Sequence, residues 1–460
     1  MVEGMAQGND TVREAPRHPA IIQLMDRINS RQAVVGIVGL GYVGLPLALT
    51  FVAQRFKVLG FDIDSEKVNS LNAGSSYIRH IASVDISNAV KSALFSATTE
   101  YGRLREADAI ILCVPTPLTR HREPDLSYVS TTVEHLVPYL REGQLIVLES
   151  TTYPGTTREL VIPVLERSGL KSGVEILVAF SPEREDPGNP THSTRSIPKV
   201  IGGDGAWALE AGCALYGSVV TATVPVSSPE TAEAVKLTEN IFRSVNIALV
   251  NELKLVFSAM GIDIWEVIDA AKSKPFGFMP FYPGPGLGGH CIPIDPFYLT
   301  WKAREFDMST RFIELAGEVN TFMPRHVIAK VGEALNFRFA KSLNNSRILV
   351  LGLAYKKNVE DIRESPALRI IELLEAQGAS VAFYDPYVSV IPVTREHVAL
   401  SNRRGIQLSS GALQEFDAVL IVTDHDEVDY QAVVKSSRLV VDTRNATRAV
   451  EYHRDRIVKA

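Results

Sequence analysis

Cysteine is scarce in this chain, with three residues in 460. Cys113, Cys213 and Cys291 lie far apart and are odd in number, which argues against a disulfide framework and against a zinc knuckle. Free cysteines without a pairing pattern are typical of a reducing compartment, so we expect a cytoplasmic protein.

An excess of positive charge is also missing. The formal net charge is −6 at pH 7, so the sequence offers no overall basic surface for nucleic acid. Residues 1–20 contain no apolar core of the signal-peptide kind, and we expect this extension to be disordered. The long apolar run at 33–53 contains glycines and a proline and divides into a strand, a turn and a helix, so we expect no membrane span.

Short apolar runs rich in valine and isoleucine alternate with helical stretches in the first half of the chain. They predict strands at 33–38, 57–61, 108–115, 145–150 and 176–182. A second series of this kind begins after about residue 340, with RILVLGLAYK as its first strand. This alternation predicts parallel, doubly wound sheets of the α/β class.

A long helical run without internal glycine or proline separates the two series. Ser228 can cap it, Pro229 suits its first turn and Gly261 ends it. Apolar residues lie on more than one of its faces, which predicts domain packing and a subunit contact in a homodimer or higher homo-oligomer. We therefore expect two Rossmann-like domains joined by a central helical domain. The predicted ranges are 21–225, 226–330 and 331–460.

The first strand is followed by GLGYVG, in which Gly39, Gly41 and Gly44 form the GxGxxG pattern of dinucleotide-binding turns. The first glycine permits a tight turn, the second lets the backbone approach a pyrophosphate, and the third lets helix and strand pack closely. Asp62 ends the next strand, where a carboxylate accepts hydrogen bonds from a ribose and repels a 2′-phosphate. We therefore expect NAD as the cofactor of this domain. Other turn residues expected at the cofactor are Tyr42 and Val43.

The loop 284-GPGLGGHCIPIDP-296 holds Cys291 among glycines, prolines and a histidine. Catalytic residues favour such loops, and a thiolate can attack an aldehyde to give a thiohemiacetal, whose oxidation gives a thioester that water hydrolyses. Together with NAD, this chemistry predicts oxidation of an alcohol through an aldehyde to an acid on one enzyme. Cys113, in an apolar strand, and Cys213, in a helical run, are expected to be small buried cysteines.

Longer motifs, distributed from about residue 30 onward, are specific to one family. They read GLGYVGLPLA, VPTPL, ESTTYPGTT, FSPERE, AEAVKLTEN, GGHCIPIDP and LGLAYKKNVEDIRESPA. With them the chain resembles the UDP-glucose/GDP-mannose dehydrogenase family, whose members oxidise a CH2OH group of a nucleotide sugar to a carboxylate with two NAD. The resemblance implies an oxidoreductase that binds a UDP-sugar through its C-terminal domain, needs no metal and has no membrane or nucleic-acid partner.

The resemblance also implies catalytic roles. Cys291 is expected to be the nucleophile, and Lys236 to stabilise the developing oxyanion and favour the thiolate. Asn240 follows Lys236 by one turn on the same helix face and accompanies it.

Three further residues are expected to handle water and protons. Asp295 is expected to orient a catalytic water or take a proton, Thr151 to share that water and contact the cofactor, and Glu183 to act in thioester hydrolysis. Thr116, in VPTPL, is expected at the cofactor.

For the sugar nucleotide, the resemblance points to the glycine-rich loop 282–289, whose backbone amides can hold a diphosphate. Lys356 or Lys357 is expected to meet phosphate charge, and His290 to have a structural role beside Cys291. The residues expected at the substrate are Glu183, Lys236, Asn240, Tyr282, Gly286, Gly288, Asn320, Lys356 and Arg363.

Two departures from the pattern bear on the substrate. Many members that act on UDP-glucose have an acidic residue where this chain has Pro187, and a lysine where it has Ile294. Both changes resemble the N-acetylhexosamine branch and imply UDP-N-acetylglucosamine as substrate, with a uronic acid for surface polysaccharide synthesis as product. UDP-N-acetylmannosamine, UDP-N-acetylgalactosamine and UDP-glucose remain alternatives, and the lost carboxylate disfavours any mechanism that requires it.

Other interpretations of the sequence stay open. Tyr298 and Lys302 form the YxxxK spacing of short-chain dehydrogenases, although they lie far beyond the glycine turn. Cys291 with His290 could be a cysteine hydrolase, which leaves the NAD pattern unexplained. A sensor that binds NAD and a UDP-sugar without turnover is a further alternative. The acidic run 424-DHDEVD-429 could hold a metal, but its ligands would have to converge.

Overall fold

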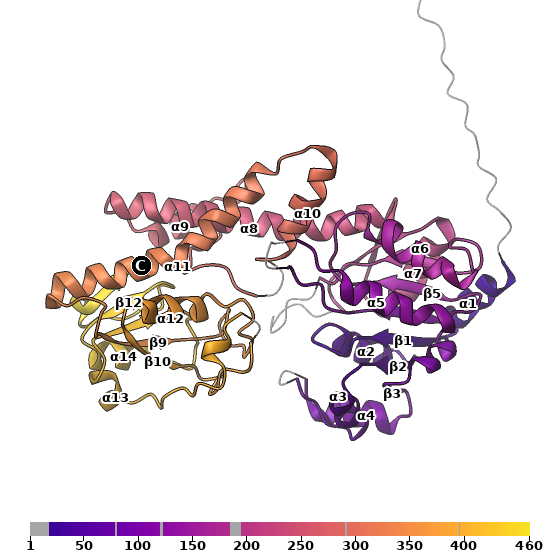
Figure 1. Ribbon diagram of the computed structural model, residues 1–460, viewed down its shortest axis with the longest axis horizontal. Helices are drawn as coiled ribbons and strands as arrows, with labels where there is room; N and C mark the ends of the chain where they lie inside the picture. Colours follow the sequence, from indigo (N-terminus) through magenta and orange to yellow (C-terminus); the bar gives the residue numbers. More distant parts are fainter. Residues whose placement is uncertain (1–17, 79–80, 120–122, 185–194, 290–291, 395) are drawn as a thin grey trace, which may run out of the picture. The chain divides into compact units, whose positions relative to one another are not determined.

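The computed structural model describes residues 18–78, 81–119, 123–184, 195–289, 292–394 and 396–460 (Figure 1). The chain divides into two compact units. The first unit comprises Met1–Thr116 and Asp125–Lys236, and the second comprises Pro117–Pro124 and Leu237–Ala460. The domain ranges predicted from the sequence stay a prediction.

The first unit contains an eight-stranded sheet in the order β3-β2-β1-β4-β5-β6-β7-β8. Its strands are β1 (Val34–Val38), β2 (Lys57–Phe61), β3 (Phe95–Thr98), β4 (Ala109–Leu112), β5 (Leu145–Leu148), β6 (Leu177–Phe180), β7 (Lys199–Gly203) and β8 (Thr223–Val226). The five predicted strands are confirmed. The sequence did not reveal β3, β7 and β8, because β3 and β8 contain few large apolar residues and β7 begins with a lysine and ends in two glycines.

The expectation of a wholly parallel sheet needs one correction. Neighbouring strands pair in parallel except β6 and β7, which are antiparallel. The amino end of β7 therefore lies at the carboxyl edge of β6.

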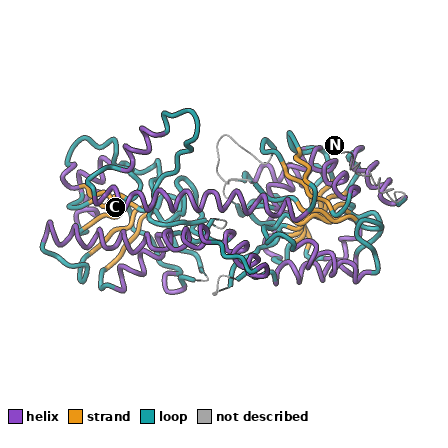
Figure 2. The backbone as a smooth tube through the Cα atoms, turned by 90° about the horizontal axis from the view of Figure 1, so that it is seen from above, coloured by secondary structure: helices purple, strands orange, loops and turns teal. Residues whose placement is uncertain are grey.

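Helices cover both faces of this sheet, as Figure 2 shows. They are α1 (Pro19–Asn29), α2 (Gly44–Ala53), α3 (Ser65–Asn72), α4 (Ser83–Lys91), α5 (Ser127–Leu136), α6 (Ile162–Leu165) and α7 (Ala206–Gly217). Alternate residues of β1 enter opposite cores: Val35 and Ile37 pack with α1, α2 and α7, whereas Val38 packs with α5 and α6. The sheet is thus doubly wound, with a core on each face. Pro19 and Ala20, assigned to the extension, form the first turn of α1.

The second unit contains a five-stranded, all-parallel sheet in the order β10-β9-β11-β12-β13. Its strands are β9 (Arg347–Leu351), β10 (Ser380–Tyr384), β11 (Ala418–Ile421), β12 (Val440–Asp442) and β13 (Ile457–Lys459). Its helices are α9 (Ile264–Ala271), α10 (Asp295–Ala303), α11 (Arg311–Phe339), α12 (Pro366–Ala376), α13 (Ser410–Gln414) and α14 (Tyr430–Ser436). Two apolar cores lie on its two faces, so it too is doubly wound.

The predicted long helix is confirmed as α8 (Pro229–Ala259). Ser228 caps it, because its Oγ accepts a hydrogen bond from Thr231 N at 3.2 Å. Three large apolar side chains of α8 are about half exposed: Phe242 (46%), Leu249 (52%) and Val256 (49%). Within the described residues, no helix is both long and apolar enough to cross a membrane.

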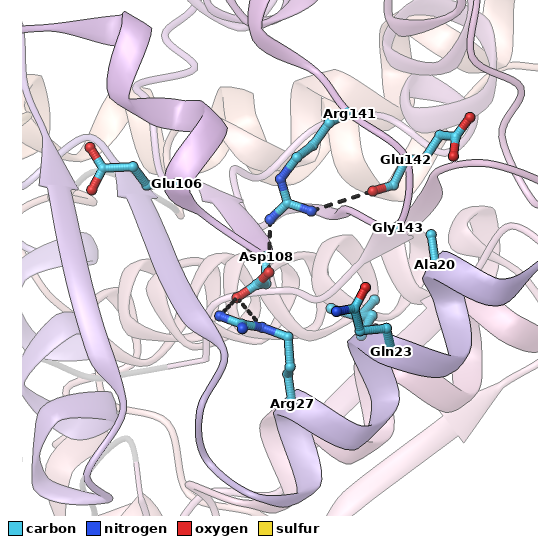
Figure 3. Close-up of a pocket in the computed structure, with 9 residues that line it drawn as sticks. Ala20, Gln23, Arg27, Glu106, Asp108, Arg141, Glu142 and Gly143 are labelled. Carbon is cyan, nitrogen blue, oxygen red and sulfur yellow. Dashed lines mark hydrogen bonds and ion pairs between the residues drawn. The ribbon is translucent and has the colours of Figure 1, made fainter.

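At the amino ends of the strands, Asp108 ties α1 to the first sheet (Figure 3). Its Oδ2 accepts from Arg27 Nε at 3.0 Å and from Val34 N at 2.8 Å. Its Oδ1 accepts from Arg141 Nη2 at 2.7 Å. Arg27, Asp108 and Arg141 line a polar cavity of about 240 Å³. Both guanidinium groups also donate to backbone carbonyls, which indicates that they hold the edge of the sheet together.

Replacing Asp108 should therefore destabilise the first unit. Asp108→Ala leaves two arginines without their carboxylate and is expected to lower the free energy of unfolding by about 2–4 kcal/mol. The control is Glu106→Gln, which breaks the exposed Arg103–Glu106 pair beside the same cavity and should cost less than about 1 kcal/mol. Urea unfolding measures both, and equal losses would contradict the anchoring role.

Candidate active site

The turn after β1 requires glycine at two positions and is open at a third. Gly39 has φ +94°, and a Cβ there would lie 2.5 Å from Cys113 O. A Cβ on Gly44, which opens α2, would lie 1.9 Å from Gly39 O. A Cβ on Gly41 would meet no atom within 4 Å. The open face at Gly41 and the amino end of α2 can therefore receive a pyrophosphate, which fits the NAD that the sequence predicts.

Asp62 helps to organise this turn. Its Oδ2 accepts from Leu40 N and its Oδ1 from Asp64 N, both at 3.0 Å, and the residue is 8% exposed. The Tyr77 hydroxyl donates to Leu40 O. Burial, followed by the charges of Asp62 and Asp64, raises the pKa of Tyr77, so this hydroxyl keeps its proton. Each carboxylate oxygen of Asp62 has lone-pair capacity left for a ribose hydroxyl.

A buried group of charges lies at the carboxyl edge of the same sheet. Lys199 Nζ donates to Glu149 Oε2 at 2.8 Å and to Glu183 Oε2 at 3.2 Å. The Tyr216 hydroxyl donates to Glu149 Oε1. Burial is the main cause that raises the pKa of Glu149 to about 7, and the pKa of the nearby Cys113 thiol is raised mainly by burial too. We name Glu149, Glu183, Lys199 and Tyr216 the carboxylate cluster.

Glu183 and Lys236, both predicted from the sequence, are brought together by the fold. Lys236 Nζ donates to the backbone carbonyl of Glu183. Lys236 lies in the first part of α8 and is 6% exposed. The main chain of Glu183 is thus held by one lysine and its carboxylate by another, Lys199. An ammonium and a carboxylate at one place can stabilise an oxyanion and activate a water.

The start of α8 is tied to the loop after β5 through Glu233. Its carboxylate accepts from Gly155 N at 2.6 Å, from Thr157 N at 2.9 Å and from Thr157 Oγ1 at 2.6 Å. This loop carries Thr151, which is partly exposed, and Thr152, which is fully buried. Among the described residues, the Thr152 hydroxyl has no hydrogen-bond partner, so it is available to a water or a ligand.

In the second unit, the predicted residues Asn240 and Asp295 are also brought together. Asn240 Nδ2 donates to Asp295 Oδ2 at 2.5 Å, and Arg243 donates to Asn240 Oδ1. Asn240 is fully buried, and Asp295, the first residue of α10, is 1% exposed. The contact joins α8 to the helix that directly follows the cysteine loop. Cys291, His290 and Pro187 themselves lie outside the described residues.

The glycine-rich loop packs against the C-terminal part of the same unit. A Cβ on Gly288 would lie 2.6 Å from Tyr355 Cβ, and one on Gly286 would lie 3.1 Å from Pro366 Cβ. Gly289 N donates to Arg363 O at 3.0 Å. Glycine is needed here for close packing, and the loop lies beside the segment after β9 that carries the other predicted substrate residues.

Asn320 supports this loop from α11. Its Nδ2 donates to Ser244 O at 3.1 Å, and its Oδ1 accepts from Asn251 Nδ2 at 2.9 Å. Asn251 Oδ1 in turn accepts from Gly284 N at 2.9 Å. The amide of Asn320 is therefore engaged within the protein, and its expected contact with substrate stays a prediction.

The other predicted substrate residues have exposed contacts. Arg363 forms an ion pair with Asp361 at 2.6 Å, and Lys357 pairs with Asp426 at 2.9 Å. Tyr282 stacks on Trp265 with ring centroids 5.4 Å apart. Lys356 is partly exposed.

Arg444 was not predicted from the sequence, and it lies just after β12. A Cβ on Gly284 would lie 2.6 Å from Arg444 Nη1, so the guanidinium lies against the glycine-rich loop. Its Nε donates to Val422 O at 3.1 Å. An arginine at this place can hold a diphosphate through its remaining N–H groups. Glu149, Lys199 and Thr152 were missed as well; the signal for Glu149 was a carboxylate at the end of an apolar run.

Tyr298 and Lys302, the pair with the YxxxK spacing, make contacts within the protein. Tyr298 donates to Pro117 O at 3.3 Å, and Lys302 pairs with Glu305 at 2.7 Å. Cys113 and Cys213 are free and of intermediate exposure, so the burial expected for both is only partial. Both pack against the core that also contains residues of α1, α2 and α7.

The acidic run at 424–429 is used by the fold. His425 Nε2 pairs with Asp385 at 2.9 Å, and Asp429 caps α14. Within the described part of the chain, no three His, Cys, Asp or Glu side chains converge as a metal-ligand set.

Sequence models of one family match the chain in order. The NAD binding domain of the UDP-glucose/GDP-mannose dehydrogenase family matches residues 33–220, its central domain matches 230–322 and its UDP binding domain matches 349–449.

Single proteins match over most of the chain. An NDP-N-acetyl-D-galactosaminuronic acid dehydrogenase from Ralstonia nicotianae is 35% identical, over 91% of this chain and 98% of its own. A UDP-N-acetyl-D-glucosamine 6-dehydrogenase from Pseudomonas aeruginosa is 36% identical, over 85% of this chain and 90% of its own. The solved structure of a UDP-D-ManNAc dehydrogenase from Pyrococcus horikoshii superposes with a TM-score of 0.82 at 32% identity, over 93% of this chain and 98% of its own.

Two glycine variants should separate folding from dinucleotide binding. Gly44→Ala forces a Cβ onto Gly39 O and is expected to cost about 2–4 kcal/mol of stability. Gly41→Ala meets no protein atom, so stability should be unchanged while the Kd for NAD rises about tenfold or more, since the backbone no longer admits the pyrophosphate. Thermal unfolding and NADH fluorescence titration measure the two effects. Unaltered NAD affinity in Gly41→Ala would place the dinucleotide elsewhere.

Proposed function

The chain belongs to the UDP-glucose/GDP-mannose dehydrogenase family, as its motifs predict, and we propose that it oxidises the C6 hydroxymethyl group of UDP-N-acetylglucosamine to the carboxylate. It is an NAD-dependent UDP-sugar dehydrogenase. The observation that carries the proposed chemistry is the contact of Lys236 with Glu183, at the carboxyl edge of the sheet that also carries the glycine turn.

The overall reaction consumes one sugar nucleotide, two NAD and one water. It converts R–CH2OH into R–COO⁻ and yields two NADH and three protons. NAD, when bound, accepts a hydride in each of the two oxidations. The Gly39–Gly44 turn and Asp62 would hold it through its pyrophosphate and ribose.

The protein supplies the groups that act on the carbonyl carbon. The Cys291 thiolate adds to the aldehyde, and the Lys236 ammonium stabilises the oxygen that becomes negative. After the second oxidation the adduct is a thioester. Glu183 and Asp295 are the carboxylates proposed to take the proton from the water that attacks it, and the thiolate leaves as the new C–O bond forms. Asn240 fixes Asp295 through the 2.5 Å hydrogen bond.

We assign the contact with this water to Thr152 in place of Thr151. The Thr152 hydroxyl is fully buried and has no partner among the described residues, whereas Thr151 is partly exposed. A buried hydroxyl without a partner is costly unless water or a ligand satisfies it.

The UDP group is proposed to lie between the glycine-rich loop and the segment after β9. Arg444 contacts the loop at Gly284 and supplies a guanidinium for the diphosphate. The exposed apolar side chains of α8 support the proposed homodimer, because large apolar side chains repeated along one helix favour a subunit contact.

The substrate assignment rests on the motifs around Pro187 and Ile294, which resemble the N-acetylhexosamine branch. The similar proteins carry names for three different N-acetylated sugars. UDP-N-acetylmannosamine, UDP-N-acetylgalactosamine and UDP-glucose are therefore the alternatives to run beside UDP-N-acetylglucosamine. The uronic acid product suits surface polysaccharide synthesis.

The stoichiometry of NADH tests the four-electron route. With excess NAD and limiting UDP-N-acetylglucosamine, we expect two NADH per sugar, measured by absorbance. Cys291→Ala should abolish the second NADH, because no thioester can form. One NADH per sugar in the unaltered protein would remove the role of Cys291, and turnover of another sugar alone would overturn only the substrate.

The two adjacent threonines form a matched pair for the hydrolytic step. Thr152→Val keeps the shape of the side chain, loses the hydroxyl and should slow kcat about tenfold or more, with acyl-enzyme accumulating on Cys291. Thr151→Val should leave hydrolysis within about threefold of the unaltered rate. Rapid quenching and intact mass spectrometry detect the acyl-enzyme, and the reverse pattern would return the role to Thr151.

A further inference from the structure

The carboxylate cluster joins four elements of the first unit. Glu149 follows β5, Glu183 follows β6, Lys199 opens β7 and Tyr216 lies in α7. The side chains of Lys199, Glu149 and Glu183 are 4%, 0% and 12% exposed. Lys199 Nζ also lies 5.4 Å from the centre of the Tyr216 ring. Water therefore screens these charges little, and the electrostatic interaction between them is strong.

The antiparallel pairing of β6 and β7 brings the start of β7, at Lys199, to the carboxyl end of β6. In the antiparallel pair of β6 and β7, residue 179 is paired with 203 and residue 180 with 202. The amino end of β7 therefore lies near the residues that follow β6, and Lys199 Nζ reaches Glu183 Oε2 at 3.2 Å. A parallel β7 would begin at the other edge of the sheet, and its first residue could not reach Glu183.

The cluster contains one ammonium and two carboxylates. Burying a charge without a partner costs several kcal/mol, so a trio of this composition favours one shared proton over two full negative charges. Glu149, whose pKa is about 7, is partly ionised near neutral pH, and its charge then opposes the ionisation of Glu183.

We propose that Lys199 and Glu149 are positioning residues for Glu183: Lys199 fixes its carboxylate, and together the two residues set the pH range in which it acts. This inference rests on the proposed role of Glu183 in hydrolysis. Lys199 favours the ionised form of Glu183, whereas a charged Glu149 opposes it.

Other groups also lie close to Glu183. Arg184 N donates to Glu183 Oε1 at 2.7 Å, while the Arg184 guanidinium donates to Pro198 O. Lys236 donates to the backbone carbonyl, and the Cys113 thiol faces the cluster with a raised pKa and hence in neutral form. Among the described residues, Lys199 donates a hydrogen bond to the Glu183 carboxylate at 3.2 Å.

The test uses opposite charge removals in the full-length protein. Lys199→Met should move the acid limb of the kcat–pH profile up by about one unit or more. It should also lower kcat at pH 7 about tenfold, with KM within about threefold. Glu149→Gln should move the same limb down. Lys199→Arg keeps the charge and should restore a limb close to that of the unaltered protein.

Three controls keep the outcome decisive. Lys171→Met removes an exposed lysine of the same unit, paired with Glu166 at 3.3 Å, and should leave the limb in place. NAD affinity and the unfolding midpoint show that each variant is folded. If Lys199→Met fails to fold, the other two variants still test the inference. Glu149→Gln must move the acid limb to lower pH, and Lys199→Arg must leave it in place.

The inference and the proposed function can fail separately. Suppose that the unaltered protein yields two NADH per sugar while the acid limb of the kcat–pH profile stays in place in Lys199→Met and Glu149→Gln, or moves in the same direction in both. Either result would overturn the positioning role alone. An unaltered protein that yields one NADH per sugar would overturn the proposed function first. Opposite shifts with accumulation of acyl-enzyme in Lys199→Met would support both.

Discussion

In both sheets the first strand ends in a tight glycine turn, and the same kind of hydrogen bond holds that turn in place. Gly39 and Gly352 have positive φ angles of 94° and 86°, and a Cβ on either would lie 2.5 Å from a carbonyl oxygen of the neighbouring crossover. Asp62 and Asp385, each at the end of the next strand, accept from the backbone amide that follows the glycine. In the second sheet His425 Nε2 also forms a hydrogen bond with Asp385 Oδ2 at 2.9 Å, so the turn is fixed by a second buried contact. The carboxyl edges of both sheets depend on these contacts.

Charges are buried at the same edge of the first sheet, and each has its partners. Lys199 serves two carboxylates, and Glu233 accepts three hydrogen bonds from the loop after β5. Burial nevertheless raises the pKa of both Glu149 and Glu233 to about 7, so their charge is only partly compensated. Groups that titrate near neutral pH beside proposed catalytic residues are typical of active sites.

Polar side chains along helix α8 form hydrogen bonds with several other elements. Glu233 holds the loop after β5, Lys236 holds Glu183, Asn240 holds Asp295, and Asn251 holds the glycine-rich loop. Spacings of three and four residues place the first three on one stripe of the helix. A polar stripe commonly faces solvent, yet these residues are buried because each satisfies a group on another element.

The sequence by itself determined what depends on neighbouring residues: the glycine turn with Asp62, the apolar strands, and α8 with its Ser228 cap. It also carried the family motifs, from which Glu183, Lys236, Asn240 and Asp295 were predicted. Only the tertiary structure paired Lys199 with Glu183, left the Thr152 hydroxyl buried without a partner, and brought Arg444 to Gly284. The direction and register of strand pairing and the packing of loops join residues far apart in the chain. No local period or propensity encodes these contacts, so their partners become known only when the chain is folded.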